Sequence, residues 1–506
     1  YEVMEAINLL SQRTSGKALE TDVMKMVPEY SGLESPFAAF EKELYAIEKT
    51  IRNKESEFHT TSSDINFKQL LVLYKQCNEF VEKAFQNSSK YGISLRVNQN
   101  LLRIKQQLYR VGVLMPLLVV DKPEDKKAKS IELAIKLIKY NCLKTNVRKL
   151  FNESTQLLSY EITQHTAKTG EHYITESKTE YFKMLYAALG GGLIVGFLCI
   201  FKIMLSKADS SYFGQAFLYS MNYSFGFIAI YVLGFTLATK QPAMTAAALI
   251  NALEDGLKKQ ANGDGEKHKS FAILFARLFR SQFIAFVGNV VMAFPVALLG
   301  IWLIDLAFDY NIAETKWEKL ITDLSPIHSM AIFHAAIAGF FLFLSGIISG
   351  SIANRDKHFD VYYRIKEHPL LKLNFGKAKA EKISKWYERY WAGIISNFWF
   401  GVFLGSTASI GLFLGLNLDI RHITFASGNL ALAVYGADYM VNNVMLFWGI
   451  LGIGIIGFVN FIVSFSLSLG LAFRSRNIPL AELRPIITSI KQHFFRKPMS
   501  FFFPTE

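Results

Sequence analysis

The most constraining feature of this chain is a series of six apolar segments between residues 182 and 473. As a helix, a segment of about 20 residues crosses the ~30 Å hydrocarbon core of a bilayer. The six predicted spans are Phe182–Leu205, Gly214–Thr239, Phe283–Phe308, Met330–Ile352, Ala392–Leu416 and Leu446–Phe473. One such run is compatible with a buried helix of a soluble protein. Six in series predict an all-α, polytopic helical membrane domain over residues 181–475.

A further apolar segment, His422–Met440, is short for a seventh span and contains Ser427, Asn429 and Asp438. These features favour a re-entrant or interfacial helix. If the segment crossed the bilayer, the C-terminus would change sides.

Residues 1–180 are polar and predict a soluble N-terminal helical bundle, because apolar residues recur there at helical spacing. The expected helices are Phe37–Lys54, Asp64–Asn87, Leu95–Val119, Lys127–Tyr140 and Thr145–Thr163. The predicted organisation is therefore a bundle (1–180), a six-helix membrane domain (181–475) and a basic, aromatic tail (476–506).

Basic residues are distributed unevenly between the loops. Three alternate connections, 240–280, 353–391 and 474–506, hold 23 Lys and Arg, whereas the other three loops hold four. Cytoplasmic loops are enriched in Lys and Arg. This asymmetry predicts that both termini, the bundle and the tail lie in the cytoplasm. The formal net charge of +13 is then a consequence of membrane topology, which argues against nucleic acid as a partner.

Three basic and aromatic segments are predicted to lie along the inner membrane surface: Lys267–Phe283, Ala378–Trp391 and Gln492–Pro504. Anionic lipid headgroups attract such segments, at about 1 kcal/mol per basic residue. Membrane lipids are thus the expected partners.

Several polar side chains lie inside the predicted spans. Buried amides need hydrogen-bond partners in lipid, so the first interpretation is packing between helices. The alternative is a lipid- or substrate-binding path lined by Gln282, Asn289, His334, Asn397 and Asn460. On the fifth span, small or polar residues recur every four positions, which permits close helix contact: Gly393, Asn397, Gly401, Gly405 and Ser409.

Two further polar groups are candidate binding sites. Pro242 breaks the second span, and a new helix beginning near Lys240, Gln241 and Thr245 could bind an anion or a headgroup. On the outer side, Asp419, Arg421 and His422 precede the short apolar segment, where they could anchor a re-entrant turn or hold a substrate.

The sequence predicts no metal site and no cofactor. The three cysteines, Cys77, Cys142 and Cys199, are too far apart for a paired-Cys motif. Phosphate-binding GxxxxGK[ST], HExxH and GxSxG motifs are absent from the sequence.

The chain resembles a bacterial membrane-protein family named for site-specific recombination (Gcr-type). The matching stretches are Thr169–Tyr181, Gly190–Gly192, Ala238–Ala248, Gly288–Ala297 and Leu418–Leu432. The resemblance implies a bacterial inner-membrane protein with a soluble helical N-terminal part, and the family's name implies DNA recombination.

Recombinase chemistry is not supported by the residues themselves. A tyrosine recombinase needs cationic groups on the scissile phosphate, followed by a nucleophilic Tyr. The only His-x-x-Arg match of this kind is His493 with Arg496, and the last tyrosine, Tyr439, precedes it. We therefore expect a non-catalytic inner-membrane protein that handles a lipid or small substrate or serves in envelope assembly. The alternatives are a site-specific recombinase and a membrane scaffold whose N-terminal bundle recruits a cytoplasmic protein.

Overall fold

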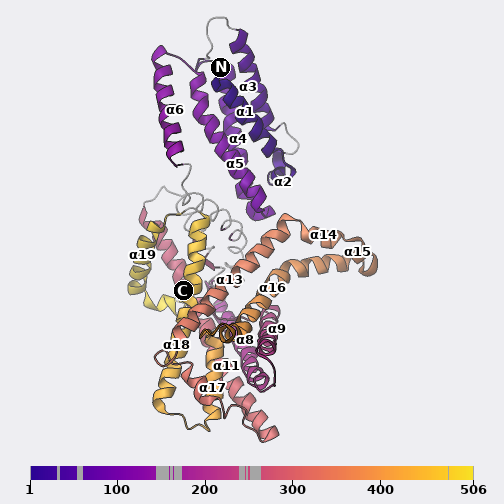
Figure 1. Cartoon of the computed structure of the whole chain (residues 1–506), viewed down its shortest axis with the longest axis vertical. Helices are drawn as coiled ribbons and strands as arrows, with labels where there is room; N and C mark the ends of the chain where they lie inside the picture. The colour runs from indigo at the N-terminus through magenta and orange to yellow at the C-terminus, as the bar shows by residue number, and fades with distance from the viewer. Residues whose placement is uncertain are drawn as a thin grey trace. The chain divides into compact units, whose positions relative to one another are not determined.

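The elements of the part of the chain that the structure describes are all helices, joined by non-helical segments (Figure 1). This computed structural model describes residues 2–30, 35–53, 61–143, 159, 163, 174–238, 245, 246, 249, 250, 264–476 and 478–504. The chain forms two compact units. Unit 1 comprises Tyr1–Glu161 and Asn354–Val361, and unit 2 comprises Ile162–Ala353 and Tyr362–Glu506.

Unit 1 is a bundle of amphipathic helices. Its elements are α1 (Glu2–Ala18), α2 (Thr21–Met24), η1 (Pro28–Tyr30), α3 (Pro36–Asn53), α4 (Ile65–Tyr91), α5 (Leu95–Leu114), η2 (Met115–Leu118) and α6 (Pro123–Leu143). Asp64 and Ser94 cap α4 and α5 by accepting backbone N–H groups of their first turns. One apolar core joins α1, α3, α4 and α5. The predicted helix Thr145–Thr163 falls almost wholly outside the described residues.

A short piece of the membrane-domain sequence belongs to unit 1. The Asn354 side chain accepts a hydrogen bond from the Ile93 N–H (2.9 Å) and donates one to the Ile93 carbonyl (2.7 Å). Gly92 adopts a left-handed conformation here (φ 73°), and a Cβ atom at this position would collide with the Asn354 carbonyl. The α4–α5 turn is therefore shaped to receive this segment.

Unit 2 contains the long apolar helices. Its elements are α8 (Lys178–Leu205), α9 (Tyr212–Val232), α11 (Asp264–Phe308), α12 (Trp317–Thr322), α13 (Ala331–His358, whose end lies in unit 1), α14 (Val361–Glu367), α15 (Pro369–Phe375), α16 (Lys377–Leu414), α17 (Ile423–Gly436), α18 (Asn443–Ser475), η3 (Leu480–Glu482), α19 (Leu483–Arg496) and η4 (Pro498–Phe501). A capping box starts α8, where the Ser177 hydroxyl accepts the Glu180 N–H and the Glu180 carboxylate accepts the Ser177 N–H.

Five described helices are long and apolar enough to cross a membrane: α8, α11 from His268, α13, α16 and α18. They coincide with five of the six predicted spans, so the protein is a polytopic helical membrane protein. The remaining predicted span, Gly214–Thr239, corresponds to α9. This helix is not among those five, and it ends at Val232, so the predicted C-terminal boundary at Thr239 was too late.

Helices α9 and α16 pack with almost no side-chain volume between them. A Cβ atom on Gly401 would overlap the backbone of Ser224, and one on Gly405 would overlap that of Ser220. The close approach lets the Ser224 hydroxyl donate to the Phe398 carbonyl at 2.8 Å. The small-residue face predicted on this span is therefore a helix-packing face.

We expect Gly401→Ala to destabilise the protein by about 1–3 kcal/mol, because the added methyl group overpacks a backbone contact that cannot relax without separating two helices. Thermal unfolding in detergent measures this loss. Gly454→Ala on α18 is the matched control, since nothing lies within 4 Å of its added Cβ. Equal effects of the two substitutions would contradict the close-packing interpretation.

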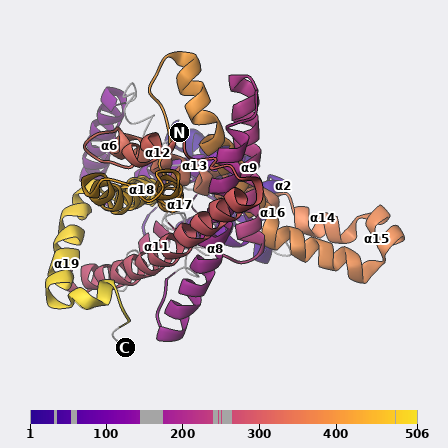
Figure 2. The ribbon, with the colours of Figure 1, turned by 90° about the horizontal axis from the view of Figure 1, so that it is seen from below.

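The segment between α16 and α18 enters the helical domain and returns. Residues 415–422 are not helical, and α17 has 14 residues, about 21 Å, too short for the ~30 Å core. Its first residue, Ile423, hydrogen-bonds through its N–H to Asn460, which lies 17 residues and about 26 Å along α18. Figure 2 shows α17 in the middle of unit 2, and α17 contacts α8, α11, α12 and α18. This geometry fits a re-entrant segment.

The C-terminal tail folds back onto α8 and α11. The Tyr181 hydroxyl donates to the Phe502 carbonyl at 3.0 Å, and the Phe501 and Phe502 rings contact Phe279. Phe501 is buried, whereas Phe494 and Phe495 are exposed. The tail therefore uses part of its aromatic residues for internal packing and leaves the rest on the surface.

Candidate functional site

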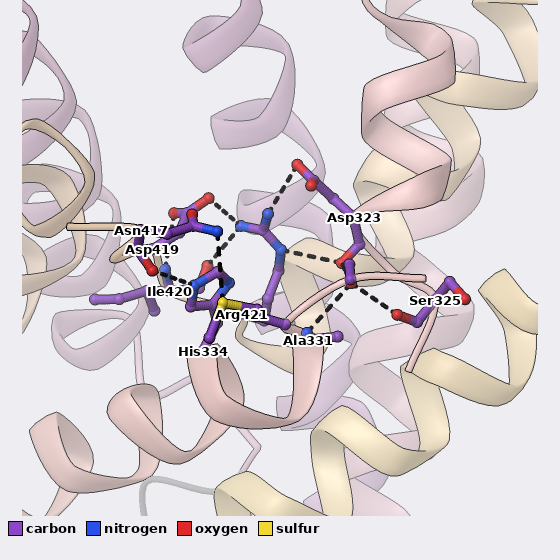
Figure 3. Close-up of polar contacts among 10 residues, drawn as sticks. Asp323, Ser325, Ala331, His334, Asn417, Asp419, Ile420 and Arg421 are labelled. Carbon is purple, nitrogen blue, oxygen red and sulfur yellow. Dashed lines mark hydrogen bonds and ion pairs between the residues drawn. The ribbon is translucent and has the colours of Figure 1, made fainter. Parts of the chain in front are cut away.

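A polar cluster surrounds Arg421, on the non-helical segment that leads into α17 (Figure 3). The Arg421 side chain is 9% exposed and forms ion pairs with Asp419 and with Asp323, the latter at 2.8 Å. Its remaining N–H groups donate to the backbone carbonyls of Asp323 (3.3 Å) and Ile420 (3.2 Å). One guanidinium thus fixes two carboxylates and two carbonyls at a place where non-helical backbone needs internal partners.

A second cation, Lys202, lies beside this cluster near the end of α8. Its ammonium lies 5.8 Å from the centre of the Tyr223 ring and 5.9 Å from that of Tyr219, within cation–π range. The Asp419 carboxylate is close enough to attract the Lys202 ammonium electrostatically.

A small pocket of about 30 Å³ separates these groups. By the usual measure this space holds about two water molecules, which suits one small charged group. Its lining residues come from α8, α9, α16 and residues 419–429, which include the start of α17: Lys202, Tyr223, Leu404, Asp419, Ile420, Arg421, His422, Phe425, Ala426 and Asn429. The pocket therefore brings both signs of charge together at the start of α17.

Burial acts on Asp419 and His422, in the segment before α17, with different net results. Burial raises the pKa of Asp419, but Arg421, Lys202 and the hydrogen bond from the Ile420 N–H together outweigh burial, so the pKa lies below its ordinary value. Burial lowers the pKa of His422 to about 4, so its ring is neutral at pH 7. The neutral ring can accept the Thr424 N–H through Nδ1 (3.4 Å) and cap α17. The charged side chains that line the pocket are therefore Lys202, Arg421 and Asp419, and Arg421 also pairs with Asp323.

Asn289 on α11 is completely buried, and both the oxygen and the nitrogen of its side-chain amide form hydrogen bonds. Its oxygen accepts the Ala238 N–H (2.7 Å) and the Thr424 hydroxyl (3.1 Å). Its nitrogen donates to the carbonyls of Ala188 (2.6 Å) and Thr236 (2.9 Å). The side chain thereby joins α8, the non-helical segment after α9, and the first turn of α17.

Asn460 on α18 holds the same turn from another direction. Its oxygen accepts the Ile423 N–H (3.2 Å), and its nitrogen donates to the carbonyls of Ala335 (2.8 Å) and Arg421 (3.0 Å). Asn460 is also fully buried. The two asparagines are thus interhelical hydrogen-bonding groups that fix where α17 begins.

The other predicted site residues have varied surroundings. His334 joins the Arg421 cluster, since its backbone carbonyl accepts the backbone N–H of Arg421 (3.3 Å) and its Nε2 lies 3.1 Å from the Asn417 carbonyl. Asn397 donates to the Gly393 carbonyl of its own helix (2.8 Å). Gln282 and Thr245 are buried. Lys240 and Gln241 lie outside the described residues, so the predicted anion site at that helix start has no structural description.

Three residues of the cluster were missed by sequence reasoning: Lys202, Tyr223 and Asp323. Lys202 carried a usable signal, because an ionisable residue inside an apolar span marks a candidate functional site. Asp323 lies in a loop 98 residues from Arg421 and carried no comparable signal.

The two residues of the recombinase-like motif lie on α19, at the tail. His493 is partly buried against Phe501, and its Nε2 lies 3.4 Å from the Ser500 hydroxyl. Burial and the nearby Lys497 lower the pKa of His493 below its ordinary value. Arg496 is exposed at the end of the same helix.

One family model matches nearly the whole chain. It spans residues 1–504 and is described as site-specific recombinase. No curated protein and no solved structure matches the chain.

Proposed function

The chain belongs to the site-specific recombinase family, and from the geometry of its membrane domain we propose that it is a non-catalytic membrane protein that binds a lipid headgroup or a small polar substrate. The observation that carries the proposal is the pocket between Lys202 and the Arg421 cluster. Ionisable groups inside a membrane domain are costly and mark binding sites or pathways.

The charge pattern of the pocket indicates the chemistry of the ligand. Arg421 is shared between Asp419 and Asp323, so the Arg421 cluster has one more negative than positive charge, whereas Lys202 contributes one positive charge. A zwitterion would match this pattern with its anionic group in the small space beside Lys202 and its ammonium outside it, at Asp419, whose side chain is 32% exposed. Phosphoethanolamine, free or as a lipid headgroup, has this chemistry.

The position of the pocket supports the same function. It lies where a non-helical segment meets the start of a short helix inside the helical domain, where Asn460 accepts the Ile423 N–H and Asn289 accepts the Thr424 hydroxyl. Substrate sites of many transporters are built at such interrupted helices. The proposal is therefore binding within the membrane domain.

We expect soluble phosphoethanolamine to raise the thermal unfolding temperature of the purified protein, because a ligand at 100 times its Kd adds about 2.7 kcal/mol of stability. Lys202→Gln should weaken binding about 10- to 150-fold, which corresponds to a charge-assisted hydrogen bond of about 1.5–3 kcal/mol. Nanodiscs with and without phosphatidylethanolamine separate a lipid source from a free substrate.

The matched control is Lys207→Gln, five residues further on, where the exposed Lys207 side chain bonds to Tyr310 (3.3 Å) and Thr315 (3.1 Å) outside the pocket. The control should retain the full ligand effect. If Lys202→Gln and the native protein respond equally to both probes, the binding proposal is wrong.

The family description favours a second function, DNA recombination. A recombination activity in cells that disappears with Arg496→Ala would support this function over the first. A protein that co-purifies stoichiometrically in mild detergent would instead favour a scaffold that recruits a partner through unit 1.

The proposed location is the bacterial inner membrane, with both termini in the cytoplasm. It is supported by the 23 Lys and Arg of three alternate connections against four in the others. The Lys202 pocket would then lie nearer the outer half of the membrane, since α8 begins on the cytoplasmic side.

A further inference from the structure

A helical hairpin extends sideways from unit 2 in both views (Figures 1 and 2). It consists of α14, α15 and the first four turns of α16, before the apolar part of that helix begins. Gly376, in a left-handed conformation (φ 78°), makes the sharp turn between α15 and α16. The Ser384 hydroxyl donates to the Tyr362 carbonyl (2.6 Å), and the Tyr362 ring contacts Tyr387. The hairpin is therefore a packed element.

The far end of this hairpin exposes large apolar side chains. Leu370 and Leu373 lie one turn apart on α15 and are 61% and 82% exposed, and Phe375 follows at 51%. These residues lie outside the five helices that are long and apolar enough to cross a membrane. Lipid contact along a span therefore does not account for their exposure.

The same hairpin is strongly basic. Residues 361–391 contain eight Lys and Arg against three Glu. Lys377, Lys379 and Lys382 on the first turns of α16 are exposed. The aromatic residues Trp386, Tyr387, Tyr390 and Trp391 follow, where α16 approaches its span, as is typical of residues at a membrane interface.

We propose that the hairpin 361–391 lies in the membrane interface and inserts Leu370, Leu373 and Phe375 among anionic lipids. Apolar side chains surrounded by Lys are the pattern of helices that bind in the plane of such a membrane. A second copy of this chain is disfavoured as the occupant, because two hairpins of like charge would repel each other. This surface is separate from the Lys202 pocket, so either proposal can fail alone.

The test measures the depth of a spin label on the full-length protein in nanodiscs. Cys142 is the one exposed cysteine of the described residues, so Cys142→Ser gives a background for labelling Leu373→Cys. Oxygen concentrates in lipid and a nickel chelate stays in water. In nanodiscs containing phosphatidylglycerol, the ratio of oxygen to nickel collision rates at position 373 should be severalfold higher than at Lys385→Cys. Lys385 is the control, since its side chain is 72% exposed on the same hairpin.

A charge-removal variant tests the lipid dependence. With Lys377→Gln, Lys379→Gln and Lys382→Gln combined, the ratio at position 373 should fall toward that at position 385. Equal ratios at the two positions in the native-charge protein would overturn the proposal. Dipolar broadening between position-373 labels of two copies would overturn it as well, since the face would then pair with another protein molecule.

Discussion

Asn289→Leu is expected to destabilise the membrane domain by about 4 kcal/mol, since four hydrogen bonds are lost at about 1 kcal/mol each. The substitution leaves the Ala238 N–H and the carbonyls of Ala188 and Thr236 in a buried place without this partner. Unfolding in detergent, followed by helical circular dichroism, measures the loss. Leucine has the same number and branching of side-chain heavy atoms, so the change removes the hydrogen bonds without leaving a cavity.

The control for this prediction is Asn222→Leu on α9. Asn222 donates one hydrogen bond to the Leu198 carbonyl (3.1 Å), so its replacement should cost about 1 kcal/mol. If both substitutions had the same small effect on stability, the four hydrogen bonds of Asn289 would not stabilise the membrane domain as we expect. A large loss of ligand binding by Asn289→Leu at unchanged stability would instead favour the path-lining alternative.

Arg421→Met is expected to cost about 3 kcal/mol, because removing one member of a buried ion pair leaves the other charge uncompensated. Here two carboxylates, Asp323 and Asp419, lose their cation, and two backbone carbonyls lose a donor. The carboxylates are about a third exposed, which places the estimate at the low end of the range for buried pairs. Thermal or denaturant unfolding checks this value.

Two companion variants make the Arg421 prediction specific. Asp419→Asn in the Arg421→Met background should recover part of the stability, since it removes one of the uncompensated charges. Arg277→Met is the control: Arg277 pairs with the well-exposed Glu176 at 2.7 Å, and such surface pairs contribute at most about 1 kcal/mol. Failure of Asp419→Asn to recover any stability would contradict the uncompensated-charge explanation.

The predicted spans were the most successful part of the sequence analysis. Runs of apolar residues identify helices in a membrane because the hydrocarbon core offers no partner for free backbone groups. The second span was placed less well. Residues 233–238 continue its apolar pattern but leave the helix, because Asn289 supplies the Ala238 N–H and the Thr236 carbonyl with partners outside it.

The candidate site was partly predictable. Asp419, Arg421 and His422 are neighbours in the chain, so their clustering could be seen in the sequence. Their association with Lys202 and Asp323 could not, because these residues lie on other elements. Asn289 and Asn460 were recognised as amides that need partners, yet nothing local indicated that both bond to the start of α17.

The sequence by itself determined that much of this protein lies in lipid and that its elements are helices. Its apolar segments require lipid, its basic loops favour one orientation, and its small residues on α16 permit close packing. The tertiary structure decided which polar groups meet, as when Asn289 reaches Thr424 across 135 residues. The reason is physical: helix formation in a bilayer follows from local apolarity, whereas a buried hydrogen bond or ion pair depends on how distant helices pack.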